Sequence, residues 1–456
     1  MYGKISTIHF VGIGGIGMSG IAEVLLNLGY TVTGSDIWES DTVSRLRQLG
    51  ARITIGHSAE NVKSAGVVVI SSAINPDNPE VTGAQDLNIP VIPRAEMLAE
   101  LMRQKYGIAV AGSHGKTTTT SMTAAVLSCG DLDPTLVVGG KVRTLGSNAR
   151  LGKSKYMVVE ADESDGSFLM LSPVISVLTN IDQEHMDHYG SMDNLENAFI
   201  SFLNKIPFYG LSVLCVDCPH VSKLANEFLK RSVTYGFSED ASLRAENVKV
   251  SGFETGFTVI EAGKELGNVK LSVPGKHNAQ NALAAIAVGM ELGMSFEETV
   301  RGLAEFEGID RRLQVKGQDS GITVVDDYAH HPREIRVTLD AVKDAGSGRT
   351  VVIFQPHRYS RTYNLFNEFR DVLLNTEVLF LMDIYPAGEK PISGVTSESL
   401  YHAIKSSGHG NVHYLNENEA DKLSRVKSAL SPGDVVITLG AGNIWQFGEK
   451  LIEELR

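Results

Sequence analysis

A short glycine-rich segment, Gly112-Ser113-His114-Gly115-Lys116-Thr117-Thr118, has the residue types of a phosphate-binding loop. In such a loop backbone N–H groups cradle the phosphates, a lysine neutralises their charge and a hydroxyl residue holds Mg²⁺. The segment departs from the common pattern, because Val110 stands where that pattern has its first glycine. We expect a strand at Ile108–Ala111 before the loop and a helix from Lys116 to about Ser128 after it. A turn that only happens to have this sequence is the alternative.

Two acidic segments follow the next two expected strands, Tyr156–Glu160 and Val174–Thr179. Their polar residues are Glu160, Asp162, Glu163 and Asp165 in the first, and Asp182, Glu184, His185, Asp187 and His188 in the second. The carboxyl ends of parallel strands are where open α/β sheets bind ligands. Oxygen ligands suit Mg²⁺, and a histidine can join them. We therefore expect a metal site beside the phosphate loop, with a solvated loop as the alternative.

A second glycine pattern, Gly12-x-Gly14-x-x-Gly17, stands between an expected strand, Thr7–Gly12, and an expected helix near Met18–Leu28. Glycines in this position let the backbone approach a pyrophosphate at a helix N-terminus. Asp36, at the end of the next expected strand, is a candidate for binding a ribose. The pattern alone is typical of an NAD dehydrogenase, and glycine packing without any ligand is the alternative.

Two further clusters lie later in the chain. Asn278 and Asn281 open an Ala-rich expected helix, Asn278–Leu292, where Asn278 is either a helix cap or, with Asn281, part of a nucleotide site. In the last third, Asp326-Asp327-Tyr328-Ala-His330-His331 follows one expected strand, and Gln355-Pro-His357-Arg358-Tyr-Ser-Arg361 follows the next. Arginines at this spacing are suited to gripping a carboxylate, and ordinary surface charge is the alternative.

The elements that position these residues alternate between strands and helices, which predicts parallel α/β sheets. A length of 456 residues allows two to four domains. We expect three, with boundaries at residues 1–106, 107–312 and 313–456. Further strands are expected at Val67–Ile70, Ile322–Val325, Thr350–Gln355, Val378–Met382 and Asp434–Leu439, with a small region of alternating strands at roughly 230–275.

Composition excludes several classes of partner. The net charge of −13 argues against a nucleic-acid or anionic-membrane binder. The sequence also lacks a run of 18 apolar residues of the kind that would predict a membrane span. The three cysteines, Cys129, Cys215 and Cys218, suggest no disulfide framework and fit a cytoplasmic location. Cys215-x-x-Cys218 with His220 is a weak candidate zinc half-site, and the end of a strand running into a turn is favoured.

These motifs together resemble the Mur ligase family, and the resemblance covers essentially the whole chain. It is carried by Gly-Ser-His-Gly-Lys-Thr-Thr, Glu-Ala-Asp-Glu-Ser-Asp, Asn-Ile-Asp-Gln-Glu-His-Met-Asp, His-Asn-Ala-Gln-Asn and Asp-Asp-Tyr-Ala-His-His-Pro. The segment Gly12–Gly20, with Gly34-Ser-Asp36, is similar to the branch that joins L-alanine to UDP-N-acetylmuramate. The resemblance implies an N-terminal Rossmann-like domain, a central ATPase-like domain with a mostly parallel sheet, and a C-terminal Rossmann-like domain.

The resemblance also implies roles for individual residues. The N-terminal domain would hold the UDP part of the substrate through Gly12, Gly14, Gly15, Gly17, Asp36, Ser71 and Ser72. ATP would contact the phosphate loop from Gly112 to Thr118, with His277, Asn278, Asn281, Arg312 and Asp327. Mg²⁺, or Mn²⁺, would bind Thr117, Glu160 and His185. Alanine would bind Tyr328, His330, Arg358 and Arg361. The catalytic residues would be Lys116, Glu160, His185 and Arg312.

The reaction that the resemblance implies is amide-bond formation through an acyl phosphate, with ADP and phosphate released, in peptidoglycan synthesis. The C-terminal domain would close about a hinge near Gly308–Leu313. Several relatives carry a carbamylated lysine, but Ala198–Leu203 contains no lysine, as in the alanine-adding branch. The partners would be small molecules, and the protein would be a monomer or a homodimer. The competing hypotheses are a peptide-recycling relative, an NAD-dependent oxidoreductase and a non-catalytic nucleotide-binding module.

Overall fold

The structure is a computed structural model that describes residues 5–143, 147–346 and 348–456. The chain forms two compact units. The first contains residues 1–247, 257–270 and 279–307, and the second contains residues 248–256, 271–278 and 308–456. Each unit is described by itself below.

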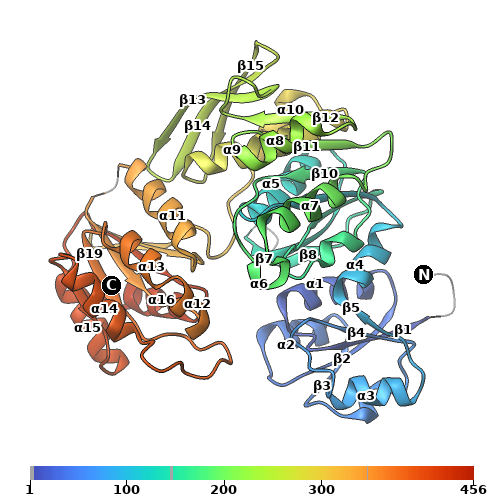
Figure 1. The fold of residues 1–456 in the computed structure, drawn as a ribbon, viewed down its shortest axis with the longest axis horizontal. Helices are drawn as coiled ribbons and strands as arrows, with labels where there is room; N and C mark the ends of the chain where they lie inside the picture. Colours follow the sequence, from blue (N-terminus) through green and yellow to red (C-terminus); the bar gives the residue numbers. More distant parts are fainter. Residues whose placement is uncertain (1–4, 144–146, 347) are drawn as a thin grey trace. The chain divides into compact units, whose positions relative to one another are not determined.

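The N-terminal sheet of the first unit is parallel throughout (Figure 1). Its strands in spatial order are β3 (Arg52–Ile55), β2 (Thr31–Asp36), β1 (Thr7–Val11), β4 (Val67–Ile70) and β5 (Val91–Pro93). The helices are α1 (Ile16–Asn27), α2 (Asp41–Gln48), α3 (Pro79–Asp86) and α4 (Arg94–Met102), with a 3₁₀ turn η1 (Ala59–Val62). The strand order reverses beside β1, where the glycine turn leads into α1, and this is the position at which such sheets bind ligands.

One carboxylate in this domain is completely buried. Glu80, in α3, accepts hydrogen bonds from Ser35 and Asn61, and its Oε2 lies 3.7 Å from His9 Nε2. Burial alone would raise the pKa of Glu80, but His9 and the two hydrogen bonds outweigh it and lower the pKa to about 2. This network ties α3 to the sheet, and nothing in the sequence pattern pointed to it.

The central sheet is larger. Its strands in spatial order are β15 (Lys264–Leu271), β14 (Glu254–Glu261), β13 (Leu243–Ser251), β12 (Ser232–Gly236), β11 (Leu211–Cys215), β10 (Ile175–Leu178), β6 (Tyr106–Ala111), β9 (Tyr156–Glu160), β7 (Thr135–Val142) and β8 (Ser147–Arg150). The helices are α5 (Lys116–Cys129), α6 (Met186–Tyr189), α7 (Met192–Leu203), α8 (Pro219–Glu227), α9 (Lys276–Glu291) and α10 (Phe296–Ala304), with a 3₁₀ turn η2 (Ser167–Met170). The pairs from β12 through β7 are parallel, as expected, but β7 and β8 form an antiparallel pair.

The antiparallel pair fastens the central sheet to the N-terminal domain. The Asn148 side chain donates a hydrogen bond to the Ile16 carbonyl, and Ser147 Oγ donates to Glu23 at 3.0 Å. A Cβ atom added to Gly20 would lie 3.1 Å from the Asn148 amide nitrogen. Glycine at this position therefore lets α1 lie close to β8, and both of these elements belong to the first unit.

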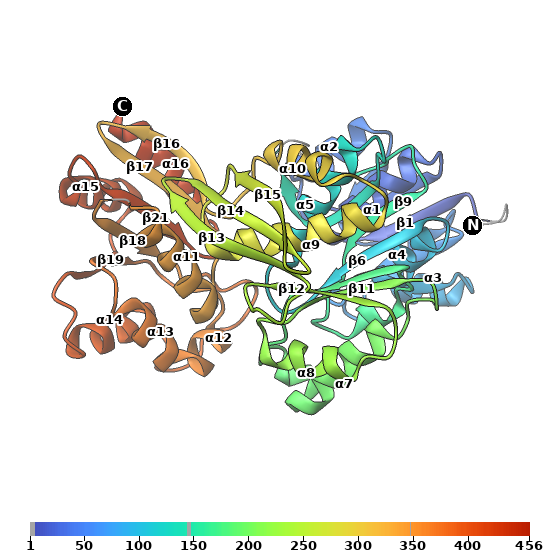
Figure 2. The same cartoon turned by 90° about the horizontal axis from the view of Figure 1, so that it is seen from above.

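The second unit is built on a mixed six-stranded sheet. In spatial order its strands are β16 (Gln314–Asp319), β17 (Ile322–Asp327), β21 (Val435–Leu439), β18 (Thr350–Phe354), β19 (Val378–Leu381) and β20 (Val412–Tyr414). The helices are α11 (Pro332–Asp344), α12 (Tyr359–Asn364), α13 (Phe366–Leu373), α14 (Ser397–Ser406), α15 (Glu419–Ala429) and α16 (Ile444–Leu455). β16 and β17 are antiparallel and lie beside α16, as Figure 2 shows.

Two expectations from sequence need correction. The sheets are not parallel throughout, because β7–β8 and β16–β17 are antiparallel pairs. Asp326 and Asp327 are the last residues of β17 instead of following it. Of the two roles left open for Asn278, the helix cap is not formed, because α9 already begins at Lys276 and the Asn278 side chain donates to the Pro274 carbonyl. The predicted domain boundaries stay predictions, and among the described residues no helix is long and apolar enough to cross a membrane.

Candidate active site

The phosphate loop lies where the sequence predicted it, between β6 and α5. Gly112 has φ of 134°, and a Cβ atom there would lie 2.1 Å from Thr179 Oγ1. Gly115, at the start of α5, has φ of 79°, and a Cβ atom there would lie 2.8 Å from Asn281 Oδ1. Both positions therefore require glycine for conformation and for space.

The segment after β10 holds this loop in place. The His114 N–H donates to Asn180 Oδ1 at 2.8 Å, and Thr179 Oγ1 donates to the His114 carbonyl at 2.6 Å. The Asp182 N–H donates to Ser113 Oγ at 2.8 Å. Thr179 and Asn180 were part of a sequence motif, but their role as supports of the loop was not predicted.

Lys116 is surrounded by oxygen atoms. Its Nζ donates to the carbonyls of Gly112 at 2.6 Å and Ser113 at 3.1 Å, and to Glu163 Oε1 at 2.9 Å. Burial alone would lower the pKa of Lys116, but the carboxylates of Glu163 and Glu160 outweigh it and raise the pKa above its ordinary value. The lysine is therefore fully charged at neutral pH and is fixed over the loop.

Glu160, at the end of β9, bridges two elements. Its Oε1 accepts a hydrogen bond from Thr117 Oγ1 at 3.1 Å, and its Oε2 accepts one from the Gly139 N–H in β7 at 2.7 Å. Burial raises the pKa of Glu160, although Lys116 and these hydrogen bonds act against the shift. The predicted metal ligands Thr117 and Glu160 are thus in contact with each other.

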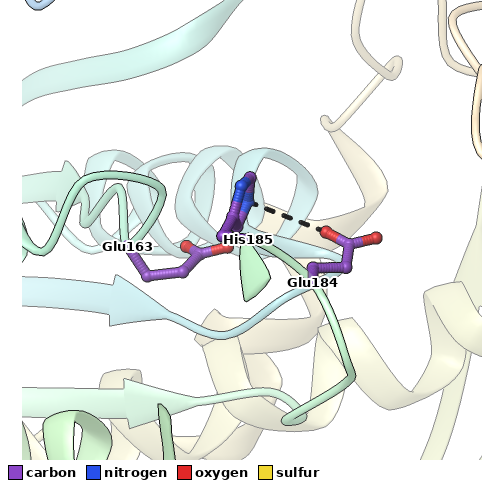
Figure 3. Close-up of side chains that lie close together, drawn as sticks. All are labelled: Glu163, Glu184 and His185. Atoms are coloured by element: carbon purple, nitrogen blue, oxygen red, sulfur yellow. Dashed lines mark ion pairs between the residues drawn. The ribbon is translucent and has the colours of Figure 1, made fainter. Parts of the chain in front are cut away.

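The third predicted metal ligand, His185, lies in a separate group. Its Nε2 is 3.6 Å from Glu163 Oε1 and 3.8 Å from Glu184 Oε2, and Figure 3 shows the ring between the two carboxylates. One ligand atom from each of these residues lies within 4.8 Å of the others. The neighbouring Glu163 carboxylate is the main cause that raises the pKa of His185. Two carboxylates and an imidazole are a donor set for Mg²⁺ or Mn²⁺.

Neither of the two glutamates that flank His185 was predicted from the sequence as a metal ligand. Glu163 and Glu184 were both in the acidic motifs, but only Glu160 was chosen as a carboxylate ligand. Lys116 connects the two groups, because it contacts Glu163 directly and interacts electrostatically with Glu160.

Further residues of the first unit lie near the two predicted nucleotide sites. Thr119 Oγ1, in α5, donates to Asn281 Oδ1 at 3.1 Å, so Asn281 lies next to the phosphate loop. In the N-terminal domain, the Gly14 N–H donates to Asp36 Oδ2 at 2.8 Å. Asp36 thus braces the glycine turn, and its predicted contact with the UDP ribose stays a prediction. Ser71 and Ser72 directly follow β4.

In the second unit, two histidines and an arginine lie together at the ends of β17 and β18. His330 Nδ1 is 3.0 Å from the Tyr328 carbonyl, and the His330 and His357 ring centroids are 5.9 Å apart. Arg361 Nη1 lies 3.2 Å from His357 Nδ1. Burial, with Arg361 nearby, lowers the pKa of His357 to about 4, and burial lowers that of His330 to the same value. His357 was not among the predicted alanine-binding residues.

Arg358 has an unusual backbone conformation for a non-glycine residue, with φ of 70°. Its N–H donates to the Tyr385 carbonyl at 2.9 Å, and the Tyr385 ring stacks on His357 at a centroid distance of 5.6 Å. This strained residue stands at the start of α12, beside the histidines. Backbone strain of this kind is concentrated at functional sites.

The remaining predicted ATP contacts of this unit are also grouped. Asp327 accepts hydrogen bonds from the N–H groups of Leu313 at 2.7 Å and Ala329 at 2.8 Å. Burial raises the pKa of Asp327 to about 6, with Arg312 acting against the shift. Burial and Arg312 lower the pKa of His277 to about 4. Arg312 therefore interacts with both His277 and Asp327.

Within the described residues, Cys215, Cys218 and His220 do not converge as a group of metal-ligating side chains. Cys215 is the last residue of β11, and Cys218 precedes α8 and hydrogen-bonds to the backbone of Ile181. His220 pairs with Glu196 at 2.6 Å. The favoured interpretation, a strand end, is confirmed.

Three family models match the chain. They are the Mur ligase family catalytic domain over residues 7–106, the Mur ligase middle domain over residues 110–289, and the Mur ligase glutamate ligase domain over residues 311–442. The chain therefore belongs to the Mur ligase family. The fold is the three-sheet α/β fold that the resemblance implied.

Individual relatives match over the full length. A UDP-N-acetylmuramate–L-alanine ligase of Geobacter sulfurreducens is 56% identical over 457 residues, which is 100% of this chain and 99% of that protein. The crystal structure of UDP-N-acetylmuramate–alanine ligase from Thermotoga maritima has a TM-score of 0.83 and 31% identity, and the match covers 98% of each chain. A murein peptide ligase of Psychrobacter arcticus shares the fold, with a TM-score of 0.70, 24% identity and coverage of 99% and 98%.

Proposed function

We propose that this protein joins L-alanine to the lactyl carboxylate of UDP-N-acetylmuramate in peptidoglycan synthesis, at the expense of ATP. The observation that carries the proposal is 56% identity, over the whole chain, to ligases of that name. The geometry of the phosphate loop supports it, because a charged lysine lies in a glycine loop at the end of a parallel strand.

The proposed reaction has two steps. The muramyl carboxylate attacks the γ-phosphate of ATP, which breaks the bond to the bridging oxygen and gives an acyl phosphate and ADP. The alanine amine, after losing a proton, then attacks the acyl carbon, and inorganic phosphate leaves. A free carboxylate is a poor acylating agent, so the phosphate serves as its leaving group.

The residues of the phosphate loop position ATP and stabilise developing charge. Lys116 neutralises negative charge on the β- and γ-phosphates, and it is held for this by the carbonyls of Gly112 and Ser113. Thr179 and Asn180 keep the loop in this conformation. Asn281 and, in the second unit, His277, Asn278, Arg312 and Asp327 are proposed to bind the rest of ATP.

A divalent cation, Mg²⁺ or Mn²⁺, fits the donor atoms of the acidic segments. Glu163, Glu184 and His185 offer two carboxylates and an imidazole within reach of one ion, and Glu160 with Thr117 offers a second set of oxygen donors. Such an ion supplies charge neutralisation for phosphoryl transfer. His185 is then a ligand and not the base that accepts the alanine proton, since its lone pair is engaged.

Alanine binding is proposed for Tyr328, His330, Arg358 and Arg361. The arginines provide positive charge for the amino-acid carboxylate. His330 and His357 have pKa values of about 4, so at neutral pH they add no charge that would repel the alanine ammonium group. The UDP group is proposed to bind Gly12, Gly14, Gly15, Gly17, Asp36, Ser71 and Ser72. We propose a cytoplasmic location for the reaction, which the free cysteines and the use of ATP support.

The test is ADP release by the purified protein with UDP-N-acetylmuramate, ATP and a panel of amino acids. We expect ADP release that depends on both the nucleotide sugar and L-alanine. Release should be weaker with glycine and serine, because a small pocket discriminates only modestly between side chains that differ by one group. Release with a tripeptide but not with alanine would indicate a peptide ligase instead. Binding of nicotinamide nucleotides would favour an oxidoreductase.

A further inference from the structure

Arg94 of the first unit touches both predicted nucleotide sites, although it has no part in the reaction as proposed. It directly follows β5 and is the first residue of α4. It therefore stands at the carboxyl edge of the N-terminal sheet, the edge that also carries the glycine turn after β1. Its side chain is 23% exposed, so a ligand can reach it.

One side of the Arg94 guanidinium lies against the glycine turn. A Cβ atom added to Gly17, the third glycine of the pattern and part of α1, would lie 2.8 Å from Arg94 Nη1 and 3.1 Å from its Cζ. An alanine at this position would therefore have to displace the guanidinium. Glycine at position 17 leaves the space in which the cation lies against the first turn of α1.

The other side of the guanidinium reaches the acidic segment after β9. Arg94 Nη2 donates a hydrogen bond to Asp162 Oδ2 at 3.1 Å. Arg94, Glu160 and Asp162 also line one small cavity, together with Ser167 and Phe168 of η2. A cation of the N-terminal sheet is thus within hydrogen-bond distance of the segment that is proposed to hold the divalent cation.

Asp162 connects Arg94 electrostatically to the phosphate loop. Burial alone would raise the pKa of Asp162, but local hydrogen bonds and the cations Arg94 and Lys116 lower it. The charge of Asp162 acts in turn on Lys116 and Glu160. Arg94 and Lys116 therefore act on the same carboxylate, one from each predicted nucleotide site.

The Arg94 guanidinium has donors left for a ligand. An arginine side chain carries its N–H donors in a planar fork that matches carboxylate and phosphate groups. Within the described part of the chain, Arg94 uses Nη2 for Asp162, and its Nε and Nη1 have no protein acceptor. Neither of these two nitrogens is enclosed by the protein. Both are therefore available to an anion.

The nucleotide sugar of the proposed reaction has two anionic groups that belong in this region. Its diphosphate is assigned to the glycine turn, and its lactyl carboxylate has to reach the γ-phosphate of ATP beside Lys116. The ionised Asp162 repels an anion that approaches from the glycine turn. A guanidinium between the turn and this carboxylate offsets that repulsion.

We propose that Arg94 binds an anionic oxygen group of the nucleotide sugar, its diphosphate or its lactyl carboxylate, and so positions the sugar between the glycine turn and the phosphate loop. Nε and Nη1 hold the anion, while Nη2 keeps its bond to Asp162, which fixes the direction of the guanidinium. The inference rests on the proposed function, because it takes UDP-N-acetylmuramate as the ligand.

Isothermal titration calorimetry with three ligands tests the binding. UDP-N-acetylmuramate has both anionic groups, UDP-N-acetylglucosamine has the diphosphate without the lactyl carboxylate, and UDP has the diphosphate alone. Arg94→Met should weaken the binding of UDP-N-acetylmuramate about tenfold or more, the loss of one charge-assisted hydrogen bond. Weakening of all three ligands identifies the diphosphate as the bound group, and weakening confined to UDP-N-acetylmuramate identifies the carboxylate.

Arg103→Met is the matched control, because Arg103 stands at the other end of α4, pairs with Glu100 and loses the same charge. It should bind all three ligands as the wild type does. Arg94→Lys keeps the charge without the planar fork and should recover part of the lost affinity. Thermal unfolding shows whether Arg94→Met is folded, and if it is not, Arg94→Lys is compared with Arg103→Lys.

ADP release provides a second measurement. Arg94→Met should raise the KM for UDP-N-acetylmuramate about tenfold or more and change the KM for ATP little. Unchanged binding of all three ligands in Arg94→Met, an equal loss in Arg103→Met, or no binding to the wild type would overturn the inference. Weakening that spares UDP but includes UDP-N-acetylglucosamine would assign Arg94 to the sugar ring and would also overturn it.

The two measurements separate this inference from the proposed function. If alanine-dependent ADP release is absent while the binding of UDP-N-acetylmuramate depends on Arg94, the proposed function fails and the role of Arg94 stands. If release is present and Arg94→Met binds the nucleotide sugar as the wild type does, only the role of Arg94 fails.

Discussion

Lys116 of the phosphate loop pairs with Glu163, 47 residues further along the chain, at 2.9 Å between Nζ and Oε1. The Glu163 side chain is 1% exposed and that of Lys116 is 14% exposed. A buried pair of this kind contributes little net stability when intact, but loss of one partner leaves an uncompensated charge. We therefore expect Lys116 to affect both the binding of phosphate and the stability of the fold.

Lys116→Ala should lower ADP release by about 10²–10³-fold, the usual effect of removing one contact that stabilises charge in a transition state. It should also destabilise the fold by about 3–5 kcal/mol, because Glu163 is left buried without its cation. Turnover and urea unfolding measure the two effects separately. Lys153→Ala, at an exposed position, is the control.

The double variant Lys116→Ala/Glu163→Gln separates the two roles further. It should recover much of the lost stability, since no unpaired charge remains, while turnover stays low. Recovery of turnover in the double variant, or near-wild-type turnover in Lys116→Ala, would contradict the assignment of the phosphate loop.

The cation site can be tested by titrating Mg²⁺ against rate. Glu160→Ala and His185→Ala should both raise the Mg²⁺ concentration for half-maximal rate. Glu163→Gln and Glu184→Gln should do the same if the group around His185 holds the ion. Asp187→Asn, exposed and two residues from His185, is the matched control. Unchanged curves for His185→Ala and Glu184→Gln would mean that this group binds no cation, and a shift only in Glu160→Ala would place the ion at Thr117.

The two arginines of the second unit should affect alanine more than ATP. Arg358→Ala or Arg361→Ala removes positive charge that is proposed to bind the amino-acid carboxylate, so the KM for L-alanine should rise by about tenfold or more. The KM for ATP should change little. Arg336→Ala, exposed on α11, is the control. An increase confined to the KM for UDP-N-acetylmuramate would assign that arginine to the muramyl group instead.

The buried carboxylate of the N-terminal domain should make stability depend on pH. The pKa of Glu80 is lowered from 4.5 to about 2 in the folded protein. Its contribution is therefore fully present above about pH 4.5 and is lost as the pH falls through about 2. The shift corresponds to about 3 kcal/mol.

Urea unfolding of the wild type and Glu80→Gln across this pH range measures the contribution. The wild type should lose its advantage over the variant as the pH falls from 4.5 towards 2, while Glu60→Gln, exposed in the neighbouring 3₁₀ turn, should behave as the wild type does. A difference between wild type and Glu80→Gln that does not vary with pH would show that Glu80 is not ionised in the folded state.

Local signals in the sequence were enough to predict the phosphate loop and most parallel strands. Tyr156–Glu160 and Val67–Ile70 have the predicted bounds, because continuous apolar runs between polar turns are read directly. The β7–β8 hairpin was missed, since the strand Thr135–Val142 contains two adjacent glycines and no regular alternation.

The arrangement of the side chains within the candidate site was harder to predict from the sequence. Which carboxylate faces His185 depends on the turn after β9 and on the left-handed conformation of His185, with φ of 56°. Neither can be read from residue types, so Glu163 and Glu184 were not chosen as ligands. Contacts over long sequence separations, such as Ser35 with Glu80 or Arg150 with Asp133, carry no local pattern at all.

The hydrogen bonds between α1 and β8 determine where the chain can be divided. Glu23 of α1 accepts a hydrogen bond from Ser147 of β8, and Asn148 of β8 donates one to the Ile16 carbonyl of α1. Glu23 and Asn148 are both less than 10% exposed. A fragment cut between β5 and β6 would expose these groups together with the apolar surface around them. The boundary that divides the first two family models is therefore a poor place to truncate the gene, and a stable fragment must retain both the N-terminal and the central sheet.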